Sequence, residues 1–139
     1  MQRKVLISAA IFGILSVIIG AWSAHGINSF IDETDPERLN KIASFRTGVQ
    51  YQFFHTFFLL FLSLIHYKKW TIKLDWVYRL IVIGVVLFSG SIYLLALRNE
   101  LGLEGITKVL GPITPIGGLV LTAAWTVLLI YALKMKKFK

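Results

Sequence analysis

Four long apolar stretches fill most of this chain of 139 residues and limit the folds that are open to it. They run over residues 5–24, 48–66, 77–97 and 115–133. A helix rises about 1.5 Å per residue and crosses the hydrocarbon core with about 20 residues, so each stretch can span a bilayer. None of the four holds an acidic residue, and Arg79 is their one fully charged side chain. We predict an all-α membrane protein with four transmembrane helices in an antiparallel bundle.

The composition agrees with a single domain over residues 1–139. Hydrophobic residues make up 56% of the chain, and the mean hydropathy of +0.71 is far above that of a soluble domain. The segments between the apolar stretches are too short for a separate soluble domain. Because the chain has no cysteine, disulfides, thiolate metal sites and cysteine nucleophiles are excluded.

The net charge of +8 is distributed as the positive-inside rule demands. Ten of the fifteen Lys and Arg side chains lie near the chain ends and between the second and third stretches: Arg3, Lys4, Lys68, Lys69, Lys73, Arg79, Lys134, Lys136, Lys137 and Lys139. Six of the seven acids lie in the other two connections. This asymmetry predicts a multi-pass protein with both termini in the cytoplasm. It makes nucleic acid an improbable partner, and we expect none.

The segment over residues 36–47 carries an apolar stripe of its own. Leu39, Ile42 and Phe45 recur at about helical spacing, and Asp35-Pro36 is typical of a helix start. We expect an amphipathic helix on the outer membrane surface before the second span. A continuous helix that runs straight into the second span is the alternative. In the next outer connection, Gly111-Pro112 predicts a turn.

Small residues predict where helices pack closely. Ala9, Gly13, Ser16, Gly20 and Ala24 follow one face of the first stretch, and small residues let helices approach each other in lipid. Contact within the bundle is the favoured interpretation, and a homo-oligomer seam is the alternative. We also expect packing at Gly117 and Gly118. Thr114-Pro115 predicts the cap and first residue of the fourth helix.

Polar side chains within or beside the apolar stretches are the candidate functional residues. We expect one hydrogen-bonded network in the outer half of the bundle, formed by His25, Gln52, His55, Ser89, Tyr93 and Thr114. An ionisable residue within the membrane is a default functional hypothesis. The structural alternative is a neutral His55 that only holds helices together. Proton transfer through His55 stays open, because histidine titrates near neutral pH.

Cofactor and enzyme signals are weak. A haem or metal site would need His25 and His55 to meet, but their expected depths differ by about two helical turns. We predict no metal and no cofactor. The chain has no Gly-rich phosphate loop or catalytic serine elbow, so we expect no enzyme. The start of the fourth helix, with Arg98 nearby, could hold an anionic lipid headgroup.

Four stretches together resemble domain-of-unknown-function family 423, which includes the transmembrane protein 256 group of mitochondria. The resemblance covers Gly20-Ala21-Trp22-Ser23-Ala24-His25-Gly26, the segment from Thr47 through Tyr51-Gln52 to His55, residues 87–97, and Gly111-Pro112-Ile113-Thr114-Pro115-Ile116-Gly117-Gly118. It implies a small four-helix integral protein of bacterial inner membranes and supplies no activity.

The leading functional expectation is a non-enzymatic structural or accessory protein. It would bind membrane lipids or a larger membrane complex, and a homo-oligomer is a further possibility. The alternative is a small transporter or channel that uses the His, Gln and Tyr network.

Overall fold

The computed structural model describes residues 2–65 and 71–134, and four long helices make up most of them. The helices are α1 (Gln2–Phe30), α2 (Arg38–Leu64), α3 (Thr71–Ala96) and α4 (Thr107–Leu133). A single 3₁₀ turn, η2 (Glu104–Ile106), precedes α4. The described ranges contain no strand, so the all-α prediction is confirmed.

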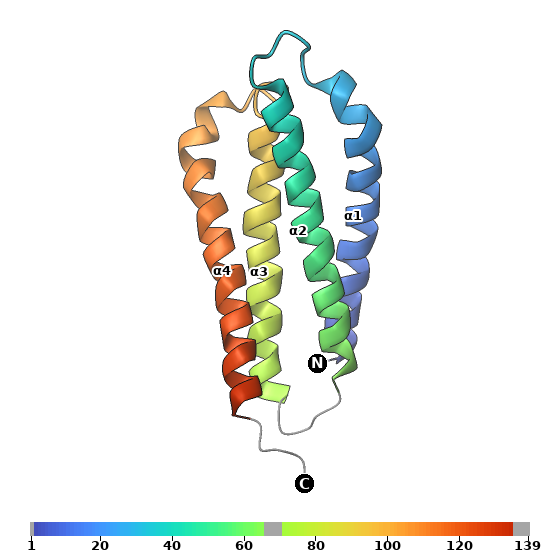
Figure 1. The fold of residues 1–139 in the computed structure, drawn as a ribbon, viewed down its shortest axis with the longest axis vertical. Coiled ribbons are helices and arrows are strands. Elements are labelled where there is room, and N and C mark those ends of the chain that lie inside the picture. The colour runs from blue at the N-terminus through green and yellow to red at the C-terminus, as the bar shows by residue number, and fades with distance from the viewer. Residues whose placement is uncertain (1, 66–70, 135–139) are drawn as a thin grey trace.

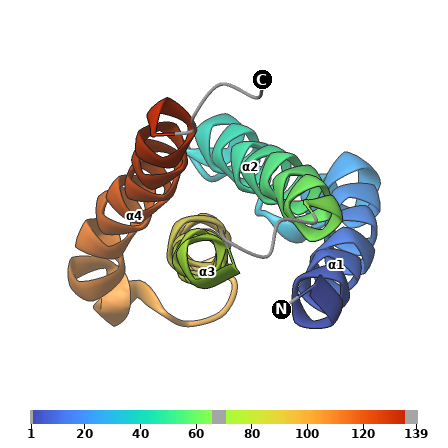
Figure 2. The same cartoon turned by 90° about the horizontal axis from the view of Figure 1, so that it is seen from below.

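Successive helices run in opposite directions along one long axis (Figure 1). Each helix packs against the next in the chain, α1 on α2, α2 on α3 and α3 on α4. Viewed along the axis, α1 and α4 lie on opposite flanks, with α2 and α3 between them (Figure 2). Residues 31–37 and 97–106 meet at one end of the bundle, which we call the loop end.

Three helices, α1, α3 and α4, are long and apolar enough to cross a membrane. The fourth, α2, is equally long but begins with charged residues and carries Gln50, Gln52 and His55, which lower its mean hydropathy. The outward faces of all four helices expose large apolar side chains, as expected for contact with lipid. Examples are Ile14, Val17, Phe54, Phe61, Val86, Leu119 and Leu129.

The predicted surface helix over residues 36–47 does not exist as a separate element. The structure selects the continuous alternative, because α2 runs without a break from Arg38 to Leu64. Of the apolar stripe, Ile42 and Phe45 are buried against the bundle, whereas Leu39 is 75% exposed. The same amphipathic pattern fits a membrane surface or a neighbouring helix, and here the neighbouring helices cover Ile42 and Phe45.

The fourth helix begins eight residues earlier than Pro115, the predicted first residue. Both Pro112 and Pro115 lie inside α4, so neither the turn at Gly111-Pro112 nor the cap at Thr114 is correct. Proline is tolerated inside membrane helices where neighbours satisfy the freed backbone groups. Each proline leaves one carbonyl without its helical donor, at Lys108 and at Gly111.

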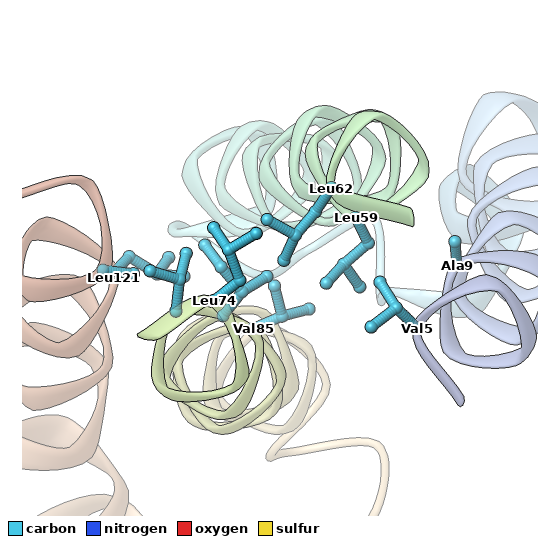
Figure 3. Packing of buried hydrophobic residues seen from close by; sticks show 10 residues of the cluster. Val5, Ala9, Leu59, Leu62, Leu74, Val85 and Leu121 are labelled. Carbon is cyan, nitrogen blue, oxygen red and sulfur yellow. The ribbon is translucent and has the colours of Figure 1, made fainter. Parts of the chain in front are cut away.

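Two apolar clusters fill the bundle. The larger draws on all four helices, as Figure 3 shows for Val5, Ala9, Leu59, Leu62, Leu74, Val85 and Leu121. The smaller, at the loop end, comprises Ile27, Ile31, Ile42, Phe45 and Ala96. Between them, along α2 and α3, lie buried polar residues that we call the polar belt: Gln52, His55 and Ser89, with Tyr93 partly buried.

Two arginines of α2 connect it to α1 through hydrogen bonds to backbone carbonyls. The Arg38 guanidinium donates to the carbonyls of Asn28 and Ile31, at the C-terminal end of α1, where free carbonyls favour a cation. The Arg46 guanidinium donates to the Ser23 carbonyl over 3.4 Å. His66, the predicted end of the second span, and the basic residues 68, 69, 136, 137 and 139 lie outside the described residues.

Candidate functional site

Gln52 joins three helices in the polar belt. Its side-chain NH₂ donates to the Phe12 carbonyl of α1 over 3.2 Å, and its oxygen accepts from the Tyr93 hydroxyl of α3 over 2.9 Å. Only 4% of the residue is exposed. Because both ends of the amide have partners, its burial costs little, and the side chain fixes the register of the three helices.

Ser89 provides a second link between α2 and α3. Its hydroxyl donates to the Gly48 carbonyl over 2.8 Å. A Cβ at Gly48 would lie 2.8 Å from the Tyr93 ring, so only glycine leaves the ring its present place. Of the other five expected residues, Ser89 and Tyr93 thus link α3 to α2 beside Gln52, whereas no side-chain hydrogen bond joins Thr114, His25 or His55 to Gln52 within the described residues.

Thr114 belongs to a different contact, between α3 and α4. Its hydroxyl lies 2.7 Å from the Ser91 hydroxyl, which also donates to the Phe88 carbonyl over 3.0 Å. The backbones are close here, because a Cβ at Gly117 would lie 2.5 Å from the Phe88 nitrogen. At Gly118 a Cβ would reach the Phe88 ring at an ordinary 3.7 Å.

His55 is buried but makes only one hydrogen bond. Its Nδ1 lies 2.7 Å from the Tyr51 carbonyl of its own helix. Since a carbonyl only accepts, Nδ1 carries a proton, and in a neutral imidazole Nε2 then presents a lone pair. Nε2 is buried and has no partner among the described residues. The residue is 6% exposed, so this is an unsatisfied acceptor within the polar belt.

His25 does not join the network. It lies exposed on α1, near the level at which Arg46 of α2 contacts Ser23. His55 lies near the level at which Gly13 meets Thr56. At 1.5 Å per residue these levels differ by roughly 15 Å, so the structure does not bring the two histidines together. No group of three His, Cys, Asp or Glu side chains fit for a metal occurs within residues 2–65 and 71–134.

The small residues of α1 face α2. Ala9 and Ser16 are buried, and a Cβ at Gly20 would lie 3.3 Å from Val49. Ala24, the last of the stripe, is exposed. The stripe therefore packs within the chain along most of its length.

A charged cluster at the loop end escaped the sequence analysis. Lys41, 4% exposed, forms an ion pair with Asp35, and the Asn99 amide donates to the same carboxylate over 3.3 Å. The hydrogen bond from Lys41 holds the pKa of Asp35 below its usual range. Arg98 forms a second ion pair with Glu37. Arg98 and Asn99 lie more than 60 residues from Glu37 and Asp35, so sequence spacing gave no signal for those two contacts.

Beside this cluster lies a groove of about 480 Å³ between α2, α3 and α4, which we call the loop-end groove. Its charged rim is formed by Glu37, Lys41 and Arg98. Further along α2 and α4 it is lined by the hydroxyl residues Ser44, Thr47 and Thr114, and α3 contributes Ile92, Leu95 and Ala96. Charged, hydroxyl and apolar side chains thus line a single concave site.

Long apolar helices with lipid-type outer faces and a buried polar belt define a small helical integral membrane protein. Residues 19–118 match the family model described as "Protein of unknown function (DUF423)". The chain belongs to this family, and the resemblance noted in its four sequence stretches is confirmed.

Named relatives cover almost the whole chain. The UPF0382 inner membrane protein YgdD of Escherichia coli K12 is 32% identical over 136 residues, which is 98% of this chain and 94% of that protein. A UPF0382 membrane protein of Staphylococcus haemolyticus is 33% identical over 96% of this chain and 98% of its own length. One from Schizosaccharomyces pombe is 37% identical over 88% of this chain and 95% of its own length. No solved structure matches the chain significantly.

Proposed function

We propose that this chain is a non-enzymatic accessory protein of the inner membrane that holds a membrane lipid in the loop-end groove. The observation that carries the proposal is the combination, in one groove, of ion-paired side chains at the loop end with hydroxyl and apolar side chains. A phospholipid offers the same three kinds of group in its charged headgroup, its ester linkages and its acyl chains. A concave site with a few placed polar groups is also the usual form of a ligand site.

The proposal includes four membrane spans with both termini in the cytoplasm. It is supported by the ten basic residues at one side of the predicted topology against five at the other. The polar residues of α2 are largely satisfied inside the bundle, as Gln52 illustrates, so α2 can also cross the bilayer. On this topology the loop end faces away from the cytoplasm, at the outer leaflet.

Native mass spectrometry of protein extracted in mild detergent tests the proposal. We expect wild type to retain one lipid and Ser44→Trp to lose it, because the indole would fill the groove. Ala43→Trp is the matched control: Ala43 is exposed on the same helix and does not line the groove. Bare wild-type protein would overturn lipid binding, and equal lipid retention in all three samples would overturn the loop-end groove as the binding site. A retained protein subunit would instead favour the role in a larger membrane complex.

The unsatisfied Nε2 of His55 favours a second candidate, a small transporter or channel that moves protons through the polar belt. Purified protein in liposomes with an internal pH-sensitive dye separates the two functions. The accessory role predicts no proton flux above that of empty liposomes. Flux that is present in wild type and absent in His55→Ala, with equal helical content, would select the transporter.

A further inference from the structure

We infer that the loop-end groove recognises a zwitterionic phospholipid headgroup with a primary amine, that is, phosphoethanolamine. The inference deepens the proposed function and rests on it, because it names the class of lipid. It is carried by the charges of the rim, by a backbone carbonyl in the groove wall, and by the hydroxyl groups below the rim.

The two ion pairs at the rim differ in how freely they can exchange partners. The side chains of Lys41 and Asp35 are 3% and 9% exposed, so this pair is fixed in the wall. The side chains of Arg98 and Glu37 are 23% and 58% exposed. An ion pair so close to water contributes little to stability and can open at low cost. The groove therefore offers a ligand one guanidinium and one carboxylate.

A zwitterion fits this exchangeable pair better than an anion does. A phosphate that binds Arg98 displaces Glu37, and an anionic lipid would then leave that carboxylate beside the phosphate. In phosphoethanolamine the ammonium group supplies Glu37 with a new partner, so each charge keeps an opposite charge beside it. Residues 25–47 and 98–114, which include the loop end, hold five basic and six acidic residues. They provide no excess of positive charge to attract an anionic lipid.

The amine also needs hydrogen-bond acceptors. Gly111 lines the groove, and its carbonyl has lost its helical donor because Pro115 carries no N–H. No side chain lies within 4 Å of the position that a Cβ would take at Gly111, so no side chain covers α4 on that side. Together with the Glu37 carboxylate, the carbonyl can accept from a primary ammonium. The quaternary ammonium of choline has no N–H to donate.

The lining below the rim fits the glycerol and ester region. Ser44 makes no hydrogen bond within the described part of the chain, so its hydroxyl is free to donate to an ester carbonyl. The Thr47 hydroxyl already donates to the Ala43 carbonyl over 3.0 Å and keeps only acceptor capacity. The acyl chains would continue along the exposed apolar surface of the helices.

A lipid competition measured by native mass spectrometry tests the inference. Delipidated protein is offered phosphatidylethanolamine, phosphatidylcholine and phosphatidylglycerol with identical acyl chains. Wild type should prefer phosphatidylethanolamine by roughly tenfold, the worth of a hydrogen bond between charged groups. Glu37→Gln should remove most of this preference, and Arg98→Gln should weaken binding of all three lipids.

Glu33→Gln is the matched control, since Glu33 is an exposed acid of the same connection that makes no ion pair among the described residues. It should keep the wild-type preference. Equal melting temperatures for the two Glu variants would show that Glu37→Gln folds normally, as its exposure leads us to expect.

The outcomes separate the inference from the proposed function. Preferred binding of phosphatidylglycerol or phosphatidylcholine, or a preference unchanged in Glu37→Gln, would overturn the headgroup assignment and leave lipid binding in place. Failure of all three lipids to bind wild type, together with bare protein after mild extraction, would overturn both.

Discussion

Gly117 shows how one absent side chain sets the distance between two membrane helices. A Cβ at this position would lie 2.5 Å from the nitrogen and 2.8 Å from the Cα of Phe88. Backbone atoms cannot move aside as a flexible side chain can, so any larger residue pushes α3 and α4 apart. Association of helices in lipid depends on close backbone packing, and the Gly117–Phe88 contact provides it between α3 and α4.

We therefore predict that Gly117→Ala lowers the free energy of unfolding by about 1–3 kcal/mol, the usual cost of overpacking. Gly118→Ala, where the Cβ meets the Phe88 ring at 3.7 Å, should be neutral or slightly stabilising because alanine favours helix. Reversible unfolding in mixed micelles, followed by the helical circular dichroism signal, measures both. Equal effects of the two substitutions would show that the backbones are less close than described.

Asp35 makes stability depend on pH at the loop end. Its pKa is lowered by the hydrogen bond from Lys41 and by the backbone N–H of Glu37. A carboxyl whose pKa is lower in the folded state stabilises the fold above its unfolded pKa, about 3.9, and this contribution is lost as pH falls through the folded pKa.

The melting temperature of wild type should thus fall with acidification below about pH 4, where the unfolded carboxyl takes up its proton. Asp35→Asn should melt lower than wild type at neutral pH and show a shallower acid decline. Glu33→Gln should follow the wild-type curve. Melting curves from pH 7 to pH 3 in one detergent check this, and parallel curves for wild type and Asp35→Asn would contradict it.

At the residue scale, the sequence predicted which side chains are unusual better than which ones meet. Gln52 and Tyr93 do meet, because both lie on the inward faces of adjacent helices. His25 lies on an exposed face, and the rotation of a uniformly apolar helix about its axis cannot be read from its sequence. On α1, Gln52 donates to the backbone carbonyl of Phe12. Every residue has such a carbonyl, so the sequence does not single this partner out.

At the element scale, the hydropathy pattern located four helices but not their ends. It marks the part of a helix that suits hydrocarbon, whereas α1, α2 and α4 continue through polar residues beyond it. The prolines of α4 led to a wrong prediction of where this helix begins. Proline is typical of the first helical position, whereas Pro112 and Pro115 lie inside α4. Tertiary packing determines where these helices end and whether a proline is tolerated inside one. That packing involves residues far apart in the sequence.

The continuity of α2 leads to a prediction about its backbone. We expect amide hydrogen exchange in micelles to be slow without interruption through residues 44–52, because the helical hydrogen bonds continue across Gly48. Exchange analysed by mass spectrometry after peptic digestion would resolve this segment. A fast-exchanging break around Gly48 would instead indicate a surface helix joined to a shorter span.

At the scale of the whole molecule, the proposed topology can be tested with single cysteines, since the chain has none of its own. We expect a membrane-impermeant maleimide to label Glu33→Cys in intact spheroplasts. Asp75→Cys and Lys134→Cys should react only after permeabilisation. Unsubstituted protein is the control for background labelling.

Two other labelling patterns would contradict the topology in different ways. Labelling of Asp75→Cys in intact cells together with Glu33→Cys would mean that α2 does not cross the membrane. Labelling of Lys134→Cys but not Glu33→Cys would mean that the bundle is inserted the other way round.

The contacts of the bundle fall into two groups that differ in when a growing chain can make them. Arg38 and Arg46 secure α1 to α2 across short stretches of sequence, as Gly117 and Thr114 do for α3 and α4. Two of the bonds that join the two pairs, Ser89 to Gly48 and Tyr93 to Gln52, connect residues 41 positions apart. During synthesis α1 and α2 can therefore pack together in the bilayer before α3 and α4 are inserted. Until then the Gly48 carbonyl and the Gln52 side-chain oxygen lack the hydrogen bonds that Ser89 and Tyr93 later donate.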